Sequence, residues 1–316
     1  MKVIVFGGSG FLGSYVADAL TEAGHDVTIF DCCESKYLKD GQKIIIGDIT
    51  DQKAVENAVQ GCDVIYNFAA IADIDIAKRK PIDVVKVNIL GNTYILEAAR
   101  KAGVKRFVFA SSVYVYSRIG AFYSESKLAS EKIIETYYRQ FGLPFTILRY
   151  GSLYGPARSS HLSSINKWIN QAIKEKKISY PGSGEEVREH IHVKDAARLS
   201  VEILTPEFEN QHILITGHQA LKSRDVLIMI KEMLNYDVQI EFLNLGNREH
   251  YHITGYSFQP GLAKRLIPNM STDIGQGLLE LIAEAHREIY PEGYDEHFNH
   301  VPDHVDDSSG EKPEEQ

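Results

Sequence analysis

Short apolar runs alternate along the chain with longer stretches in which apolar residues recur every three or four positions. In the first half, apolar and β-branched runs at residues 3–6, 26–30, 43–46, 64–68, 107–110 and 144–148 predict buried parallel strands. Helical spacing follows the first run, and it returns at residues 51–59, 82–102 and 123–141. Strands and helices in this alternation indicate an α/β fold with a doubly wound parallel sheet.

A glycine-rich turn joins the first predicted strand to the first helix. Gly7, Gly10 and Gly13 lie in it at three-residue spacing, overlapping the pattern Gly8-x-Gly10-x-x-Gly13. Such glycines allow a tight bend, a close approach of the backbone to a pyrophosphate, and close packing of the helix on the strand, and the helix N-terminus then attracts the phosphates. Asp31 ends the second strand, where a carboxylate binds the adenosine ribose and repels a 2′-phosphate. The pattern predicts a Rossmann-type NAD site, although an ordinary strand-end aspartate is the alternative reading of Asp31.

The alternation changes after residue 156. Helices are predicted at residues 162–175, 195–204, 223–234 and 277–289, with short strands at 189–193 and 212–216. We therefore expect a Rossmann domain of residues 1–156, to which pieces near 189–217 return, and a smaller C-terminal α/β substrate-binding domain of residues 157–188 and 218–293. Residues 294–316 are acidic and poor in aromatics, which predicts a disordered tail.

Composition narrows the class of protein. The net charge of −9 argues against a general nucleic-acid surface, and an anionic substrate would need local arginines. Three cysteines do not make a disulfide framework. No charged and apolar leader precedes residue 3, and no apolar run approaches the length of a membrane span, so we expect a reduced, soluble, cytoplasmic protein that does not bind membranes.

Tyr123 and Lys127 lie four positions apart on the helix predicted at residues 123–141, so they share one helix face. A nearby cation favours the phenolate, and we expect Lys127 to lower the pKa of Tyr123 from its usual value of about 10 towards that of a general base. Ser112 ends the preceding strand, at the sheet edge where open α/β folds bind ligands. A solvated surface pair is the alternative interpretation of Tyr123 and Lys127.

Further segments extend this pattern in order along the chain. They are Asp48-Ile49, Asn67-Phe68-Ala69-Ala70, Asn88 with Gly91, Ser111-Ser112 with Val115-Tyr116, Leu148-Arg149-Tyr150, Tyr154-Gly155-Pro156, and Arg188 before His190-Ile191-His192-Val193-x-Asp195. With them, residues 1 to about 290 resemble an extended short-chain dehydrogenase/reductase of the NAD-dependent epimerase/dehydratase family.

The resemblance implies roles for individual residues. Tyr123 would be the catalytic base, Lys127 would bind the nicotinamide ribose, and Ser112 would bond the reacting sugar oxygen. The implied NAD-binding residues are Gly7, Gly10, Phe11, Leu12, Gly13, Asp31, Asp48, Ile49, Phe68, Ala69, Ala70, Asn88, Tyr123, Lys127 and Tyr150. The implied substrate-binding residues are Ser112, Val113, Ser152, Arg188 and Arg248. The two arginines would bind the diphosphate of a nucleotide sugar, with surface solvation as the alternative for each.

The resemblance also bears on the reaction. Family dehydratases usually carry an Asp-Glu pair after the serine or threonine, but Val113 and Tyr114 offer no carboxylate there. A nucleotide-sugar epimerase is therefore favoured, acting at C4 through a transient keto sugar by hydride removal and return. A net NAD(P)-dependent reductase or dehydrogenase of a nucleotide-linked sugar is the first alternative, and a non-catalytic NAD-binding module the second. Three departures leave the sugar open: the segment from Ser112 to Tyr123 is short, Ser117 replaces a usual glycine, and Ser152 a usual asparagine.

Finally, the resemblance implies a homodimer in which helices 82–102 and 123–141 pair across a two-fold axis. Apolar residues of the second helix support this: Ile133, Ile134, Tyr137, Tyr138 and Phe141. No metal site is expected, because His190-x-His192 and His250-x-His252 lack a third ligand at suitable spacing. Cys32 and Cys33 follow Asp31 directly and would lie near the adenine edge.

Overall fold

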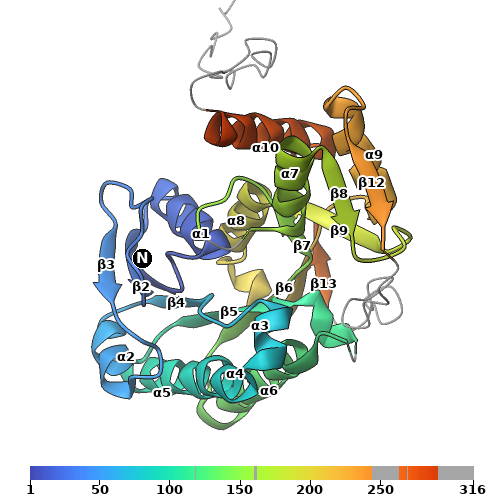
Figure 1. Ribbon diagram of the computed structural model, residues 1–316. Helices are drawn as coiled ribbons and strands as arrows, with labels where there is room; N and C mark the ends of the chain where they lie inside the picture. Colours follow the sequence, from blue (N-terminus) through green and yellow to red (C-terminus); the bar gives the residue numbers. More distant parts are fainter. Residues whose placement is uncertain (118, 160–161, 244–262, 269, 291–316) are drawn as a thin grey trace, which may run out of the picture.

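An eight-stranded parallel sheet forms the centre of the larger domain (Figure 1). The computed structural model describes residues 1–117, 119–159, 162–243, 263–268 and 270–290 of the chain. The sheet order is β13-β10-β6-β5-β4-β1-β2-β3. Its strands are β1 (Lys2–Phe6), β2 (Asp26–Asp31), β3 (Lys43–Ile46), β4 (Val64–Asn67), β5 (Arg106–Ser112), β6 (Phe145–Tyr150), β10 (Gln211–Ile215) and β13 (Lys264–Leu266). The order reverses between β1 and β4, which is the ligand-binding point of such sheets and confirms the predicted Rossmann-type fold.

Helices cover both faces of this sheet because its strands are apolar on both sides. One face packs against α1 (Phe11–Glu22) and α8 (Val193–Glu202), and a core that includes Val16 and Leu199 lies between. The other face packs against α2 (Gln52–Ala58), α5 (Asn92–Ala102) and α6 (Ala121–Phe141), around a core that includes Leu96 and Ile134. Figure 1 shows the two layers on opposite sides of the sheet.

The helix predicted at residues 82–102 is less regular than its pattern suggests. It consists of α4 (Pro81–Val84), a π-helical turn η1 (Val85–Gly91) and α5, and the short helix α3 (Ile74–Arg79) precedes it. Pro81 begins α4 at a position where its missing N–H costs nothing. The π turn surrounds Asn88, whose backbone carbonyl accepts a hydrogen bond from Ser130 of α6 at 2.9 Å. Such side-chain bonds are not visible in a hydrophobic pattern.

The smaller domain lies beside the carboxyl ends of the large sheet. It contains α7 (Ser164–Glu175), α9 (Ser223–Met233), α10 (Ile274–Ile289), a sheet of β7 (Ser152–Tyr154), β9 (Val187–His192) and β11 (Ala220–Lys222), and the pair β8 (Lys177–Tyr180) and β12 (Gln239–Phe242). Three predicted assignments need correction. β13 extends the large sheet, whereas β7 and β9 belong to the small one, so of the predicted returning pieces only β10 joins the large sheet. β7 and β13 are only three residues long, too short for a pattern to reveal them.

Several predictions lie outside the described residues: Arg248, the pair His250 and His252, and the tail 294–316. Among the residues that the structure does describe, no helix has the length and apolar character needed to cross a bilayer.

Candidate functional site

The glycine turn between β1 and α1 is packed too closely to admit side chains. Gly7 has a φ of +75°, and a Cβ on it would lie 2.5 Å from the backbone nitrogen of Ala69. A Cβ on Gly13 would lie 2.2 Å from the carbonyl oxygen of Gly7. α1 begins after Gly10 with no side-chain cap, so its N-terminus faces the turn through backbone groups alone. This cradle fits a pyrophosphate, as the sequence predicted.

Asp31 lies at the carboxyl end of β2, beside the glycine turn. Its carboxylate accepts hydrogen bonds from the backbone nitrogens of Ser9, at 2.9 Å, and Cys33, at 3.1 Å. Asp48 follows β3, and its side chain accepts a bond from the backbone nitrogen of Thr50 at 2.8 Å. Both carboxylates are therefore oriented by the backbone.

A large cavity of about 1310 Å³ extends from the glycine turn into the smaller domain. It is lined by most of the predicted site residues: Gly7, Gly10, Phe11, Leu12, Gly13, Phe68, Ala70, Ser112, Tyr123, Lys127, Tyr150, Ser152 and Arg188. The remaining described ones do not line it: Asp31, Asp48, Ile49, Ala69, Asn88 and Val113. The cavity is large enough to hold a dinucleotide and a second ligand side by side.

Ser112, Tyr123 and Lys127 meet on one wall of this cavity. The hydroxyl of Ser112 is close enough to the Tyr123 phenol to lower the pKa of that phenol. The ammonium of Lys127 donates to the backbone carbonyl of Ala110 at 2.7 Å and lies 5.9 Å from the centre of the Tyr123 ring. It also lies 4.7 Å from the centre of the Phe109 ring. β5 supplies the serine and the carbonyl, and α6 supplies the phenol and the ammonium.

The protonation of this group differs from the prediction. Desolvation raises the pKa of Tyr123 to about 12, although the Ser112 hydroxyl lowers it in part. Desolvation also lowers the pKa of Lys127 to about 7, partly offset by the nearby carboxylate of Glu131. The predicted lowering of the Tyr123 pKa by Lys127 is therefore wrong for this arrangement. The reason is burial, which disfavours the charged form of both groups.

A buried ion pair behind the site was not predicted. Glu131 has no exposed surface, and it receives bonds from Arg149 Nη2 at 2.6 Å and Nε at 3.0 Å. Ser111 donates to the same carboxylate at 2.5 Å, and the Arg149 guanidinium also bonds the Tyr116 hydroxyl at 2.9 Å. The only sequence signal was the position of Glu131, four residues after Lys127 on α6. This pair ties β5, β6 and α6 together at the site.

Asn88 has a different place from the one implied by the resemblance. Its side-chain oxygen accepts from the backbone nitrogen of Ile71 at 2.8 Å. Its amide donates to the Ile71 carbonyl at 3.1 Å and to the Ser126 hydroxyl at 2.9 Å. Both amide hydrogens are thus used within the protein, and Asn88 supports the cavity wall rather than lining it.

The short segment between Ser112 and Tyr123 places an aromatic residue over the site. Tyr114 lines the cavity, and its ring meets that of Tyr123 edge-on with centroids 6.4 Å apart. Gly120, with a φ of +109°, allows this, because a Cβ there would lie 2.8 Å from the Tyr114 ring. The sequence indicates only that Tyr114 offers no carboxylate; it does not show that the Tyr114 ring lines the cavity.

The far end of the cavity belongs to the smaller domain. Arg188 lines it from β9, together with His190, whose pKa burial lowers to about 4. Glu186 also lies there, and the Tyr180 hydroxyl and the backbone nitrogen of Gly184 donate to its carboxylate. This end therefore carries a cation, a neutral imidazole and a carboxylate already held by donors. The sequence predicted the role of Arg188, indicated His190 only as half of a histidine pair, and gave no sign of Glu186.

Comparison with known proteins decides the family. A model of the NAD dependent epimerase/dehydratase family matches residues 3–216, more than half of the chain. The chain belongs to this family. The family and its cofactor, NAD, are those predicted from the sequence, and the glycine cradle fits the pyrophosphate of that cofactor.

Individual relatives of the family differ in reaction. The UDP-N-acetyl-alpha-D-glucosaminuronate decarboxylase of Bacillus cytotoxicus is 31% identical over 248 residues, which are 70% of this chain and 76% of the relative. The dTDP-glucose 4,6-dehydratase of Escherichia coli is 28% identical over 283 residues, 74% of this chain and 77% of the relative. The solved UDP-glucuronic acid 4-epimerase of Bacillus cereus, in complex with UDP-glucuronic acid and NAD, is 21% identical and superposes with a TM-score of 0.78, covering 92% of this chain and 100% of that one. That structure shows a shared fold.

Proposed function

We propose that this protein is an NAD-dependent epimerase that inverts C4 of a nucleotide-linked sugar through a transient keto sugar. The observation that carries the proposal is the meeting of Ser112, Tyr123 and Lys127 on the wall of one cavity that continues to Arg188. The residues after Ser112 supply an apolar side chain and a phenol, not the carboxylates a dehydratase would use. Oxidation at C4 followed by reduction on the other face needs no further acid or base.

The chain's own residues would divide the work on the sugar hydroxyl. Tyr123 would take its proton, and Ser112 would bond the same oxygen. Hydride acceptance and return are the chemistry that NAD supplies when bound. Because the pKa of Tyr123 is about 12 here, loss of its proton needs positive charge nearby, and Lys127, whose own pKa is about 7, would supply that charge only while it is protonated.

The substrate class is inferred from the far end of the cavity. Arg188 would bind the diphosphate, and Arg248 is proposed as its second cation. Trp168 and Tyr180 line the same end with rings 5.5 Å apart, which favours a flat base against them. Relatives that act on UDP- and dTDP-linked sugars support a nucleotide sugar here.

A decarboxylase is the second candidate, favoured by the relative from Bacillus cytotoxicus. A keto group at C4 makes a carboxylate at C6 a β-keto acid, which loses carbon dioxide readily. The first oxidation would use the same Ser112, Tyr123 and Lys127. Only the product distinguishes the two reactions.

The test is a panel of nucleotide sugars, including hexoses and uronic acids, analysed by chromatography and NMR. The proposal expects a C4 isomer as product with no net consumption of added NAD. Tyr123→Phe should lower the rate at least about 100-fold while bound NAD is retained. Tyr138→Phe on the exposed side of α6 serves as the control and should change little. Carbon dioxide release would favour the decarboxylase, and stoichiometric reduction of NAD would favour a dehydrogenase. Full activity of Tyr123→Phe would contradict the assignment of the base.

A further inference from the structure

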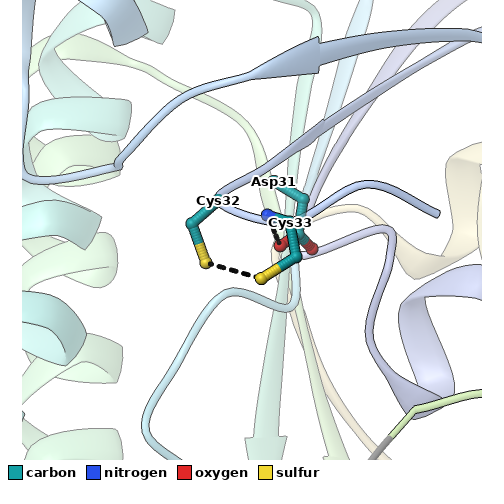
Figure 2. A group of neighbouring side chains, drawn as sticks. All are labelled: Asp31, Cys32 and Cys33. Carbon is teal, nitrogen blue, oxygen red and sulfur yellow. Dashed lines mark hydrogen bonds between the residues drawn. The ribbon is translucent and has the colours of Figure 1, made fainter.

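Two adjacent exposed cysteines lie beside Asp31 at the end of β2 (Figure 2). Their sulfur atoms face each other at 3.8 Å, and both lie within 4.8 Å of a carboxylate oxygen of Asp31. The backbone holds this cluster together, because the Cys33 nitrogen donates to Asp31 at 3.1 Å and the Ser9 hydroxyl donates to the Cys33 carbonyl at 2.9 Å. The cluster is therefore fixed by the same turn that forms the dinucleotide cradle.

The distance between the two sulfurs, at which one thiol can donate to the other, also suits two ligands of one metal ion. Two sulfurs on one tetrahedral ion, with bonds of about 2.3 Å, lie about 3.8 Å apart. The distance in this structure is 3.8 Å. A disulfide would need about 2.0 Å. Two thiolates and a carboxylate are a donor set that selects zinc and its heavier relatives over magnesium or calcium.

We propose that Asp31, Cys32 and Cys33 bind one thiophilic divalent ion of the zinc class. The two thiolates form a chelate, the Asp31 carboxylate supplies the third ligand, and water completes the tetrahedron. Binding replaces the two thiol protons, which are released to solvent, and no electron is transferred. The expectation of no metal site, which considered only the histidine pairs, is revised at this one place.

The ion would compete with the dinucleotide. Asp31 is the carboxylate proposed to bind the adenosine ribose, and its second oxygen accepts from the Ser9 nitrogen within the glycine turn at 2.9 Å. A carboxylate bound to a cation is a poorer acceptor for ribose hydroxyls, and a coordinated ion occupies space next to them. This consequence rests on the proposed cofactor placement, whereas binding of the ion does not.

Cadmium is the probe, because thiolate-to-cadmium charge transfer absorbs in the ultraviolet and histidine ligands do not give this band. The full chain, freed of bound dinucleotide, is titrated with Cd²⁺ under reducing conditions. The band should saturate at one ion per chain and disappear in Cys32→Ser/Cys33→Ser. Asp31→Asn should keep the band and weaken binding about 10-fold or more. Cys62→Ser, which removes the third and distant cysteine, is the control and should titrate like the native chain.

Competition is measured by repeating the titration with increasing NAD. The apparent Kd for cadmium should rise in proportion to the NAD concentration. A band that persists in the double serine variant overturns the site. If saturating NAD leaves the cadmium absorption band of the native chain unchanged, the proposed competition is overturned. Neither result bears on the Tyr123→Phe assay, so failure of this inference and failure of the proposed function remain distinguishable.

Discussion

Lys127 is buried in the cavity wall, and the free-energy cost of charging it there can be worked out from its pKa. Burial lowers that pKa from 10.5 to about 7, so the unfolded chain binds this proton more tightly than the folded chain. The folded chain is therefore destabilised below pH 7, and stability is regained as the pH rises from about 7 to 10.5. Each pH unit in this window is worth about 1.4 kcal/mol. Between pH 7 and pH 9 the native chain should thus recover about 3 kcal/mol from this one residue.

Lys127→Met keeps the length of the side chain and removes the charge. At pH 6 the variant should be more stable than the native chain, even after losing the hydrogen bond to the Ala110 carbonyl. That advantage should shrink by about 3 kcal/mol between pH 6 and pH 9. The variant should also lose most of its activity, since the proposed function places Lys127 at the reaction.

The assay is urea unfolding of both chains at pH 6 and pH 9, followed by circular dichroism after removal of bound dinucleotide. Lys132→Met, at an exposed lysine on the same helix, is the control and should show no pH-dependent difference from the native chain. A difference between Lys127→Met and the native chain that is equal at both pH values would refute the reasoning.

Two further predictions concern the cradle and the surface of the large domain. Gly13→Ala should abolish retention of NAD while the chain still folds, because the new Cβ would lie 2.2 Å from the Gly7 carbonyl oxygen. Equilibrium dialysis of NAD is the measurement, and Gly275→Ala in α10 is the control. We also propose that the chain forms a homodimer through α4, η1, α5 and α6, because Ile82, Leu90 and Phe122 are 68%, 42% and 47% exposed there. Light scattering should then give twice the chain mass of 35.5 kDa at micromolar concentration, and Leu90→Glu should halve it. A native mass equal to one chain would exclude the dimer.

The sequence predicted most of the large sheet because its strands are apolar runs separated by helices of clear period. The glycine turn was equally predictable, because at Gly7 and Gly13 the backbone packs so closely that no residue with a side chain fits. Ser112, Tyr123 and Lys127 were found because strand ends and helix spacing determine where such side chains meet. In each case a local rule was sufficient.

Features that depend on distant contacts were not predicted. The pair of Glu131 and Arg149 joins α6 to β6, and neither residue has an unusual local context. The pKa of Tyr123 depends on burial, which spacing alone does not give. Part of the apolar surface expected for a dimer is in fact core, because Ile134 is only 1% exposed. The three-residue strands β7 and β13 exist only through their partners.

Because η1 is a π-helical turn, the number of residues from Val85 to Gly91 affects the geometry of this part of the helix. A π turn holds one residue more than the α-helix that would replace it. Deleting a single residue between Val85 and Gly91 would restore a regular helix, and α4 and α5 would keep about the same angular relation, because the wide turn holds its extra residue locally. The effect would fall on the turn itself, from which Asn88 reaches both Ile71 and Ser126. The wide turn thus matters for the support of the cavity wall and not for the outward face of α4.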